Sequence, residues 1–387
     1  MKGTFLSCLL NFIALYGMAQ PLGTLNYDYI YHPEPEVSFS VKLVRSNSNC
    51  NAVFTAVFNN DLFASSDFEI RFETRQRLGD KEGTLISVPV ATLATTNKIL
   101  AGRFNFPVTS GKIFVALVTK IPANEHFYFW RYIPEYNTPY IVSGGILNTH
   151  PYLTTDSNIR LGGFQSDLLV CSYYGNDFPA AAPPFAIKQG YVPGIIKPDS
   201  IYTLRSTDEQ KFTESGLYLI QSDTTSESGL AFRKENDYPK FATIESLIGP
   251  LIYICTRQEY DKLQRSNGEK KKFDQVILGI TGDTDRAKNF MRTFYYRVEL
   301  ANNFFSSYKE GWKTDRGMIF IIYGLPSEVY LFEDREVWEY RSDGEKETFV
   351  FTRSATVFDP ENFVLIRNKK YEDTWYRSID LWRKSRF

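Results

Sequence analysis

Apolar and polar residues alternate over short runs in the first third of the chain. Residues 37–43 and 68–73 each place Val, Phe, Ile or Leu at every second position. A period of two predicts half-buried antiparallel strands. Further strand candidates follow at 85–90, 102–106 and 113–119. Several short strands at this spacing are typical of an immunoglobulin-like β-sandwich, which we predict for residues 20–147.

Residues 148–240 continue the strand pattern in a second, smaller unit. Strand candidates lie at 168–174, 200–204, 216–221 and 229–232. A cluster of proline and alanine at 178–185 interrupts them, and we predict that it forms an exposed, extended loop. The pattern therefore predicts a β-rich middle domain.

After residue 241 the apolar residues recur at every third or fourth position, which is the period of an α-helix. Thr256 and Glu259 form a capping box that predicts a short helix. An apolar stripe predicts a long helix at 284–308, with Gly311 as its C-terminal glycine.

The end of the chain is predicted to form a small sheet and a closing helix. The apolar run 318–323 is predicted as a strand, followed by strands around 338–340 and 349–351. We expect an α+β domain at 241–387, with helices followed by an antiparallel sheet. The predicted fold class is multidomain and mainly β, with this α+β domain at its C-terminus.

The first 19 residues have the pattern of a secretory signal peptide. Lys2 precedes an apolar run that is too short to span a bilayer, and Gly17 and Ala19 stand at the −3 and −1 positions of a cleavage site. A lipoprotein cysteine at Cys8 is the alternative, although the apolar run continues past it. We expect an exported chain without a transmembrane span.

The charges of the chain balance, with 44 Lys and Arg against 45 Asp and Glu and a formal net charge of -1. This balance excludes a nucleic-acid binder that works by overall electrostatic attraction. The cysteines left after cleavage, Cys50, Cys171 and Cys255, match no zinc or redox spacing, and we expect buried thiols.

The most distinctive stretch of the sequence runs from Tyr308 to Pro326 and reads YKEGWKTDRGMIFIIYGLP. The residues that stand out in it and in the strand after it are Gly311, Trp312, Thr314, Asp315, Arg316, Gly317, Tyr323, Gly324, Pro326, Trp338 and Tyr340. With the long helix before them and a closing helix around Trp375 and Trp382, residues 241–387 resemble the C-terminal domain of the GWxTD proteins. Asp-Gln-Val-Ile at 274–277 replaces a Phe-Trp pair of that family, so the chain resembles a divergent member.

The resemblance implies an exported, cell-envelope group of the Bacteroidota with no established catalytic activity. The order of the last strands is also similar to that of small outer-membrane assembly lipoproteins. Both similarities imply the periplasm or the outer membrane as the location.

The motif also has a physical interpretation of its own. We expect Trp312 to pack against the long helix, where its burial contributes roughly 2–3 kcal/mol. Thr314 and Asp315 would accept hydrogen bonds from nearby backbone N–H groups, and Arg316 would pair with a carboxylate. Gly317 would let the chain enter the strand at 318–323. The functional alternative is that Asp315 and Arg316 line a binding cleft or act on a substrate.

The sequence lacks the usual catalytic motifs: a G-x-S-x-G elbow, an H-E-x-x-H helix, a phosphate-binding loop and a paired-cysteine metal site. His32, His126 and His150 form no triad that spacing could identify. We predict no catalytic residue, cofactor or metal, while a carboxylate pair that acts on glycans stays open.

Two further sites are candidates. Phe127, Phe129, Trp130 and Tyr132 form a dense aromatic cluster, which we interpret as a buried strand or, if exposed, as a partner surface. Ser200, in Asp-Ser-Ile, resembles an O-glycosylation site, with a plain turn as the alternative.

We expect a non-enzymatic structural or interaction component of an outer-membrane-associated complex, possible roles being outer-membrane protein assembly or secretion. Its partners would be outer-membrane or periplasmic proteins. The alternative is an envelope polysaccharide-binding protein or a glycan-acting enzyme.

Overall fold

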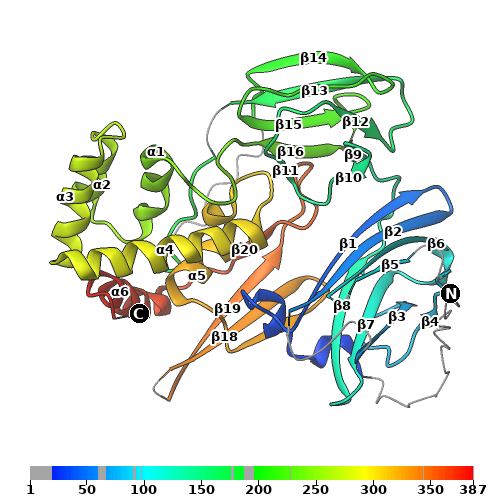
Figure 1. Ribbon diagram of the computed structural model, residues 1–387, viewed down its shortest axis with the longest axis horizontal. Helices are drawn as coiled ribbons and strands as arrows, with labels where there is room; N and C mark the ends of the chain where they lie inside the picture. The colour runs from blue at the N-terminus through cyan, green and yellow to red at the C-terminus, as the bar shows by residue number, and fades with distance from the viewer. Residues whose placement is uncertain are drawn as a thin grey trace, which may run out of the picture.

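The computed structural model describes residues 20–59, 67–89, 93–96, 98–175, 178–186, 196–226, 228–342 and 344–386. The predicted signal peptide and Cys8 lie outside these residues. The described chain consists of a β-sandwich, a second β-rich part, and helices followed by a C-terminal sheet (Figure 1). This arrangement confirms the predicted fold class.

The N-terminal part is a sandwich of two antiparallel sheets. Their strand orders are β1-β2-β6-β5 and β4-β3-β7-β8, which correspond to strands A-B-E-D and C′-C-F-G of the immunoglobulin fold. The strands are β1 (Val37–Ser46), β2 (Asn49–Phe58), β3 (Phe68–Arg75), β4 (Thr84–Leu85), β5 (Leu93–Thr95), β6 (Ile99–Pro107), β7 (Ile113–Lys120) and β8 (Glu125–Tyr132), with the 3-10 turn η5 (Val108–Ser110) after β6. Of the strand predicted at 85–90, residue 90 lies outside the described residues, and among residues 85–89 only Leu85 lies in a strand, β4.

The middle part contains two sheets around one core. A five-stranded sheet has the order β11-β16-β15-β13-β14, and a three-stranded sheet has the order β10-β9-β12. The strands are β9 (Tyr140–Ser143), β10 (Ile146–Leu147), β11 (Tyr152–Leu153), β12 (Ile159–Gly162), β13 (Leu168–Tyr174), β14 (Ser200–Arg205), β15 (Gly216–Gln221) and β16 (Leu230–Lys234). Strands β9 and β10 pair within this part, so its pairing begins before residue 148.

The helical part confirms the long helix and the capping box and corrects the end of the helix. Its elements are α1 (Ile244–Ile248), η6 (Gly249–Tyr253), α2 (Arg257–Gln264), α3 (Lys270–Thr281) and α4 (Thr284–Phe305). Thr256 and Glu259 form the predicted capping box of α2. Helix α4 ends at Phe305, and Gly311 begins the 3-10 turn η7 (Gly311–Lys313) instead of closing the helix.

The prediction of a strand at 318–323 was wrong, because these residues belong to helix α5 (Asp315–Tyr323). Thr314 caps its N-terminus, where the Thr314 hydroxyl accepts a hydrogen bond from the Gly317 N–H. Nearly all of α5 is buried, so its apolar residues form a continuous run. Periodicity alone does not separate such a buried helix from a buried strand.

The C-terminal sheet has the order β17-β18-β19-β20 and is followed by the closing helix. Its elements are β17 (Glu328–Leu331), β18 (Arg335–Ser342), β19 (Glu345–Arg353), β20 (Phe363–Leu365), η8 (Lys369–Tyr371) and α6 (Glu372–Arg383). The α6 helix docks internally, as predicted: the Trp382 indole N–H donates to the Ile322 carbonyl at 3.0 Å. No helix among the described residues combines the length and apolar character that a membrane span needs.

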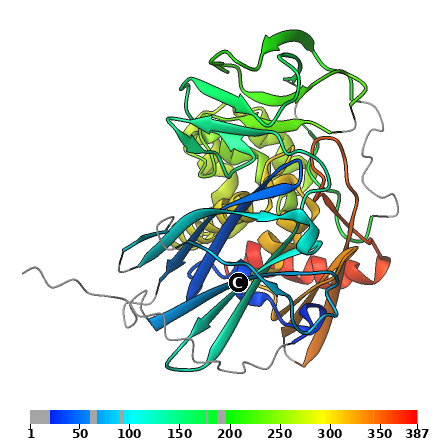
Figure 2. The ribbon, with the colours of Figure 1, turned by 90° about the vertical axis from the view of Figure 1, so that its right-hand side faces the viewer.

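The sandwich and the C-terminal sheet lie side by side and share one hydrophobic core (Figure 1, Figure 2). One face of β7 and β8 packs inside the sandwich, while Val115, Tyr128 and Trp130 on the other face belong to the shared core. Burial on both faces explains the unbroken apolar run at 113–118, because neither face has to be polar.

Two N-terminal 3-10 turns, η1 (Leu22–Thr24) and η2 (Asp28–Tyr31), fill the joint between these parts. The Tyr27 N–H donates to the Val329 carbonyl at 2.8 Å, and the Val329 N–H donates to the Asn26 side chain at 2.8 Å. The Tyr29 hydroxyl donates to the Tyr128 carbonyl at 2.8 Å. The turns therefore connect β8 of the sandwich to β17 of the C-terminal sheet.

Candidate functional site

Gly311 lies where the motif approaches helix α4 most closely. A Cβ atom on Gly311 would be 2.0 Å from the Ala301 carbonyl oxygen, so only glycine fits without a shift of the backbone. The Gly311 N–H donates to the Tyr238 hydroxyl at 3.1 Å, and the Trp312 N–H donates to the Asn302 side chain at 3.1 Å. The motif loop is therefore anchored to α4 through its backbone.

The Trp312 ring packs on η6 and belongs to the same hydrophobic core as the buried face of α4. It lies against Gly249, and its centroid is 6.1 Å from that of Tyr253. The Tyr253 hydroxyl donates to the Trp312 carbonyl at 2.9 Å. With 6 % of its surface exposed, Trp312 is a core residue.

Thr314 and Gly317 form a tight turn that begins α5. The Thr314 hydroxyl donates to the Gly311 carbonyl at 2.7 Å and accepts from the Gly317 N–H at 3.0 Å. A Cβ atom on Gly317 would lie 1.9 Å from the Gly311 carbonyl oxygen. Here the predicted role of Thr314, to fix the turn through a backbone N–H, matches the observed hydrogen bond.

Asp315 connects the start of α5 to the end of the C-terminal sheet. Its carboxylate accepts from the Leu365 N–H at 2.8 Å and pairs with Arg367, whose Nη2 lies 2.5 Å from Oδ1. Asp315 and the Arg367 side chain are buried. The acceptor role of Asp315 was predicted, but its partners lie about 50 residues away in the sequence.

Arg316 has the carboxylate partner that the sequence predicted, and this partner is Glu336. Arg316 Nη1 lies 3.0 Å from Glu336 Oε2, and the guanidinium lies over the Phe363 ring at 4.5 Å. Glu336 Oε1 also accepts from the Tyr31 hydroxyl at 2.5 Å and from the Trp338 indole at 2.7 Å. This buried carboxylate on β18 therefore links the N-terminal turns to the motif.

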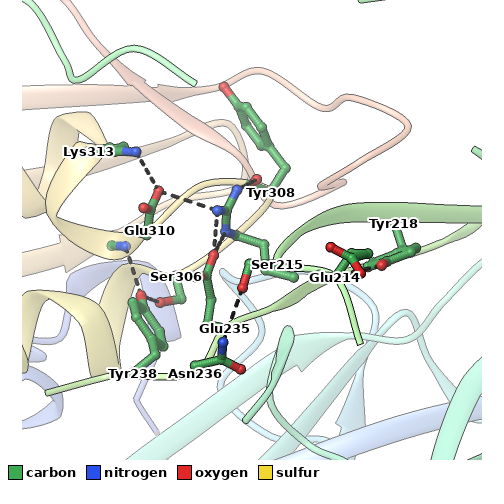
Figure 3. A network of polar contacts seen from close by, with 12 residues as sticks. Glu214, Ser215, Tyr218, Glu235, Asn236, Tyr238, Ser306, Tyr308, Glu310 and Lys313 are labelled. Carbon is green, nitrogen blue, oxygen red and sulfur yellow. Dashed lines mark hydrogen bonds and ion pairs between the residues drawn. The ribbon is translucent and has the colours of Figure 1, made fainter. Parts of the chain in front are cut away.

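A second polar network ties the motif loop to the middle sheet (Figure 3). Arg233 of β16 donates to Glu235 at 2.7 Å and to the Tyr308 carbonyl at 3.3 Å, and it lies 3.8 Å from Glu310. Lys313 pairs with Glu310 at 3.0 Å. Burial raises the pKa of Glu235 despite the charge of Arg233.

Two groups beside Tyr308 titrate closer to neutral pH than usual. Burial lowers the pKa of Lys309 to about 8 and raises the pKa of Asp359 to about 6. The Lys309 amine lies 5.8 Å from the centroid of the Tyr308 ring, and Phe358 packs on the same ring with centroids 6.1 Å apart. Such shifts make Lys309 and Asp359 the candidates for proton chemistry next to the motif.

The later motif residues pack together behind α5. Tyr323 has ring contacts with Tyr340 at 5.5 Å, and the Tyr340 hydroxyl donates to the Gly324 carbonyl at 3.0 Å. Trp338 and Pro326 are buried. These residues form the link between α5 and the C-terminal sheet.

The aromatic cluster of β8 makes contacts within the chain. Phe127 and Phe129 pack inside the sandwich, and Trp130 and Tyr132 pack on the core shared with the C-terminal sheet. Phe127 is 7 % exposed and Trp130 is 8 % exposed, because β8 is covered on both faces. The structure thus supports the buried-strand interpretation of this cluster over the exposed partner surface.

The remaining candidates lie outside this region. Ser200 is exposed at the start of β14. The Nδ1 of His126 lies 3.1 Å from the Thr119 hydroxyl oxygen, and His150 stacks on Tyr152. Cys50 and Cys171 are buried, as predicted, whereas Cys255 is only partly buried. Within the described ranges, no three His, Cys, Asp or Glu side chains gather as a metal site would require.

Sequence reasoning missed the partners that complete the site, which are Glu235, Glu310, Glu336, Asp359 and Arg367. All of them lie on other elements or in loops, and charged residues at such positions look like ordinary surface charges in a sequence. Alternation gave one usable signal: Glu336 shares the strand face of the apolar Trp338 and Tyr340.

A comparison with protein-family models matches residues 216–384 to the GWxTD domain. The match begins at β15, so it includes the strand β16 that carries Arg233. No curated protein and no solved structure matches the chain.

We predict that Gly311→Ala destabilises the protein by about 3 kcal/mol, because its Cβ would overlap the backbone of α4. Gly279→Ala is the matched control, since Gly279 lies in α3 and an added Cβ would meet nothing within 4 Å beyond the backbone of its own helix. The control should stabilise the protein by about 0.5 kcal/mol. Urea unfolding measures both changes, and equal effects would contradict this role of Gly311.

We predict that Asp359→Asn changes the pH dependence of stability. The pKa of Asp359 is raised from 3.8 to about 6, so the folded wild type loses stability as the pH rises from 3.8 to 6. Asparagine still accepts from the Glu361 N–H but carries no charge. The free energy of unfolding of the variant, taken relative to that of the wild type, should therefore rise by about 2 kcal/mol from pH 4 to pH 7.5. A constant difference in the free energy of unfolding across this range would refute the shift.

Proposed function

We propose that this GWxTD domain-containing protein is a non-enzymatic structural component of a cell-envelope protein complex. Outer-membrane or periplasmic proteins would be its partners, and assembly or secretion of outer-membrane proteins would be its process. The observation that carries the proposal is how the motif side chains are used. The side chains of Trp312, Thr314, Asp315 and Arg316 all make contacts within the chain, which suits a domain that holds a shape.

An exposed sheet edge supports a role in protein interaction. Strand β14 is at the end of the five-stranded sheet, and in this strand Ile201 is 57 % exposed and Tyr202 is 40 % exposed. A sheet edge with apolar side chains is suited to pairing with a strand of another protein. Strand β14 pairs with β13, which pairs with β15, so this edge is held in the same sheet as the first strands of the GWxTD domain.

A glycan-binding role is the second candidate, and one hollow favours it. This cavity of about 380 Å³ lies between the sandwich and the middle part, and residues lining it include Arg45, Glu135, Tyr136, Asn137 and Gln165. Tyr136 is 71 % exposed. An exposed aromatic ring offers a stacking face to a sugar, and the amide and charged groups around it offer hydrogen bonds.

Affinity purification of the full chain from native envelopes in mild detergent tests the first proposal. We predict that outer-membrane proteins co-purify with the chain and that Ile201→Lys reduces their yield at least fivefold, because lysine on an edge opposes strand pairing. Ile146→Lys is the matched control, since Ile146 is 74 % exposed on β10. It should leave the yield and the melting temperature unchanged.

An absence of co-purified envelope proteins would contradict the structural role. Saturable binding of envelope polysaccharide that is lost in Tyr136→Ala would favour the glycan-binding role instead. Equal losses in Ile201→Lys and Ile146→Lys would remove β14 as the interaction surface.

A further inference from the structure

Residues 178–186, with the sequence FPAAAPPFA, lie along the surface of the GWxTD domain. The Ala181 N–H donates to the Lys313 carbonyl at 3.0 Å, and the Asn368 N–H donates to the Pro184 carbonyl at 3.0 Å. Arg367 Nη2 donates to the Ala182 carbonyl at 3.0 Å. The segment was predicted to be an exposed loop, but its main chain is held at three successive points.

The two ends of the segment are held by aromatic contacts. The ring of Phe178 meets that of Tyr308 edge to face with centroids 5.3 Å apart, and Phe185 lies 5.4 Å from Tyr376. Between these rings Pro184 is buried. Each aromatic pair contributes to binding beyond its buried area.

The groups that bond to the main chain of the segment or meet its rings belong to the matched domain, whereas the segment precedes it. Tyr308, Lys313, Arg367, Asn368 and Tyr376 lie within residues 216–384. Main-chain hydrogen bonds combined with pockets for a few side chains are how proteins recognise extended peptides. A proline-rich segment also loses little conformational entropy when it binds. The contacts are therefore of the kinds that a peptide-binding site makes.

We propose that the surface of the GWxTD domain under residues 178–186, which we call the groove, is a binding site for extended, proline-containing peptide segments with aromatic ends. Residues 178–186 occupy it in cis, and a segment of the same chemistry in a partner protein would bind by displacing them. The tether gives the cis segment an effective concentration on the order of millimolar, so displacement requires a better-fitting segment. This inference does not depend on the proposed envelope role.

The test uses the full chain with residues 178–186 replaced by a glycine-serine stretch of equal length. A fluorescent FPAAAPPFA peptide should bind this emptied variant saturably and bind the intact chain at least tenfold more weakly. A peptide with both phenylalanines changed to alanine should bind at least fivefold more weakly than the original.

Tyr376→Ala in the emptied variant should weaken peptide binding at least threefold, because it removes the ring that meets Phe185. Tyr296→Ala is the matched control, since Tyr296 is 47 % exposed on α4, and it should leave binding unchanged. A folded emptied variant that binds no peptide would overturn the proposal, as would equal binding to the intact chain. If the intact chain forms a dimer and the emptied variant does not, residues 178–186 bind a second copy, and the claim that they occupy the groove in cis is overturned.

If the emptied variant does not fold, Phe185→Ala in the otherwise intact chain tests the proposal instead. Amide hydrogen exchange at Ala181 and Asn368 should accelerate at least tenfold, because both N–H groups bond across the groove. Unchanged exchange at both amides would overturn the proposal.

Discussion

The buried ion pair between Asp315 and Arg367 joins three segments that lie far apart in the sequence. Asp315 begins α5, Arg367 follows β20, and Arg367 also holds the carbonyl of Ala182. Burying two charges is costly unless each of them is well paired. Asp315 is satisfied by the Leu365 N–H together with Arg367. The pair therefore fixes the positions of β20, the edge strand of the C-terminal sheet, and of residues 178–186 relative to the motif.

The GWxTD motif works as a structural joint in this account. Its glycines allow the loop to touch α4 and to turn into α5, and its polar residues reach to other elements. Through Glu336, the same motif is connected to the N-terminal turns and hence to the sandwich. A chain built in this way can hold an exposed strand edge and a peptide groove at fixed positions, which suits an assembly component.

Most of the fold could be predicted from the sequence, because its strands alternate and its long helix has a clear stripe. Strands β13 and β15 have the predicted bounds. Two of the failures share a cause, since local patterns do not show what covers a segment. Helix α5 is buried all round and looked like a strand, and residues 178–186 looked like a loop although the GWxTD domain holds them. The motif residues were found, but Arg367 and Glu336 were not, because those contacts are made only in the folded chain.

Hydrogen exchange in the Asp315→Asn variant tests most directly whether the ion pair organises the groove. The substitution keeps a side chain of the same size but removes the charge that holds Arg367. We expect the Ala181 amide to exchange at least tenfold faster in this variant, while amides in the middle of α3 keep their wild-type rates. Wild-type exchange at Ala181 in a folded Asp315→Asn protein would contradict the account.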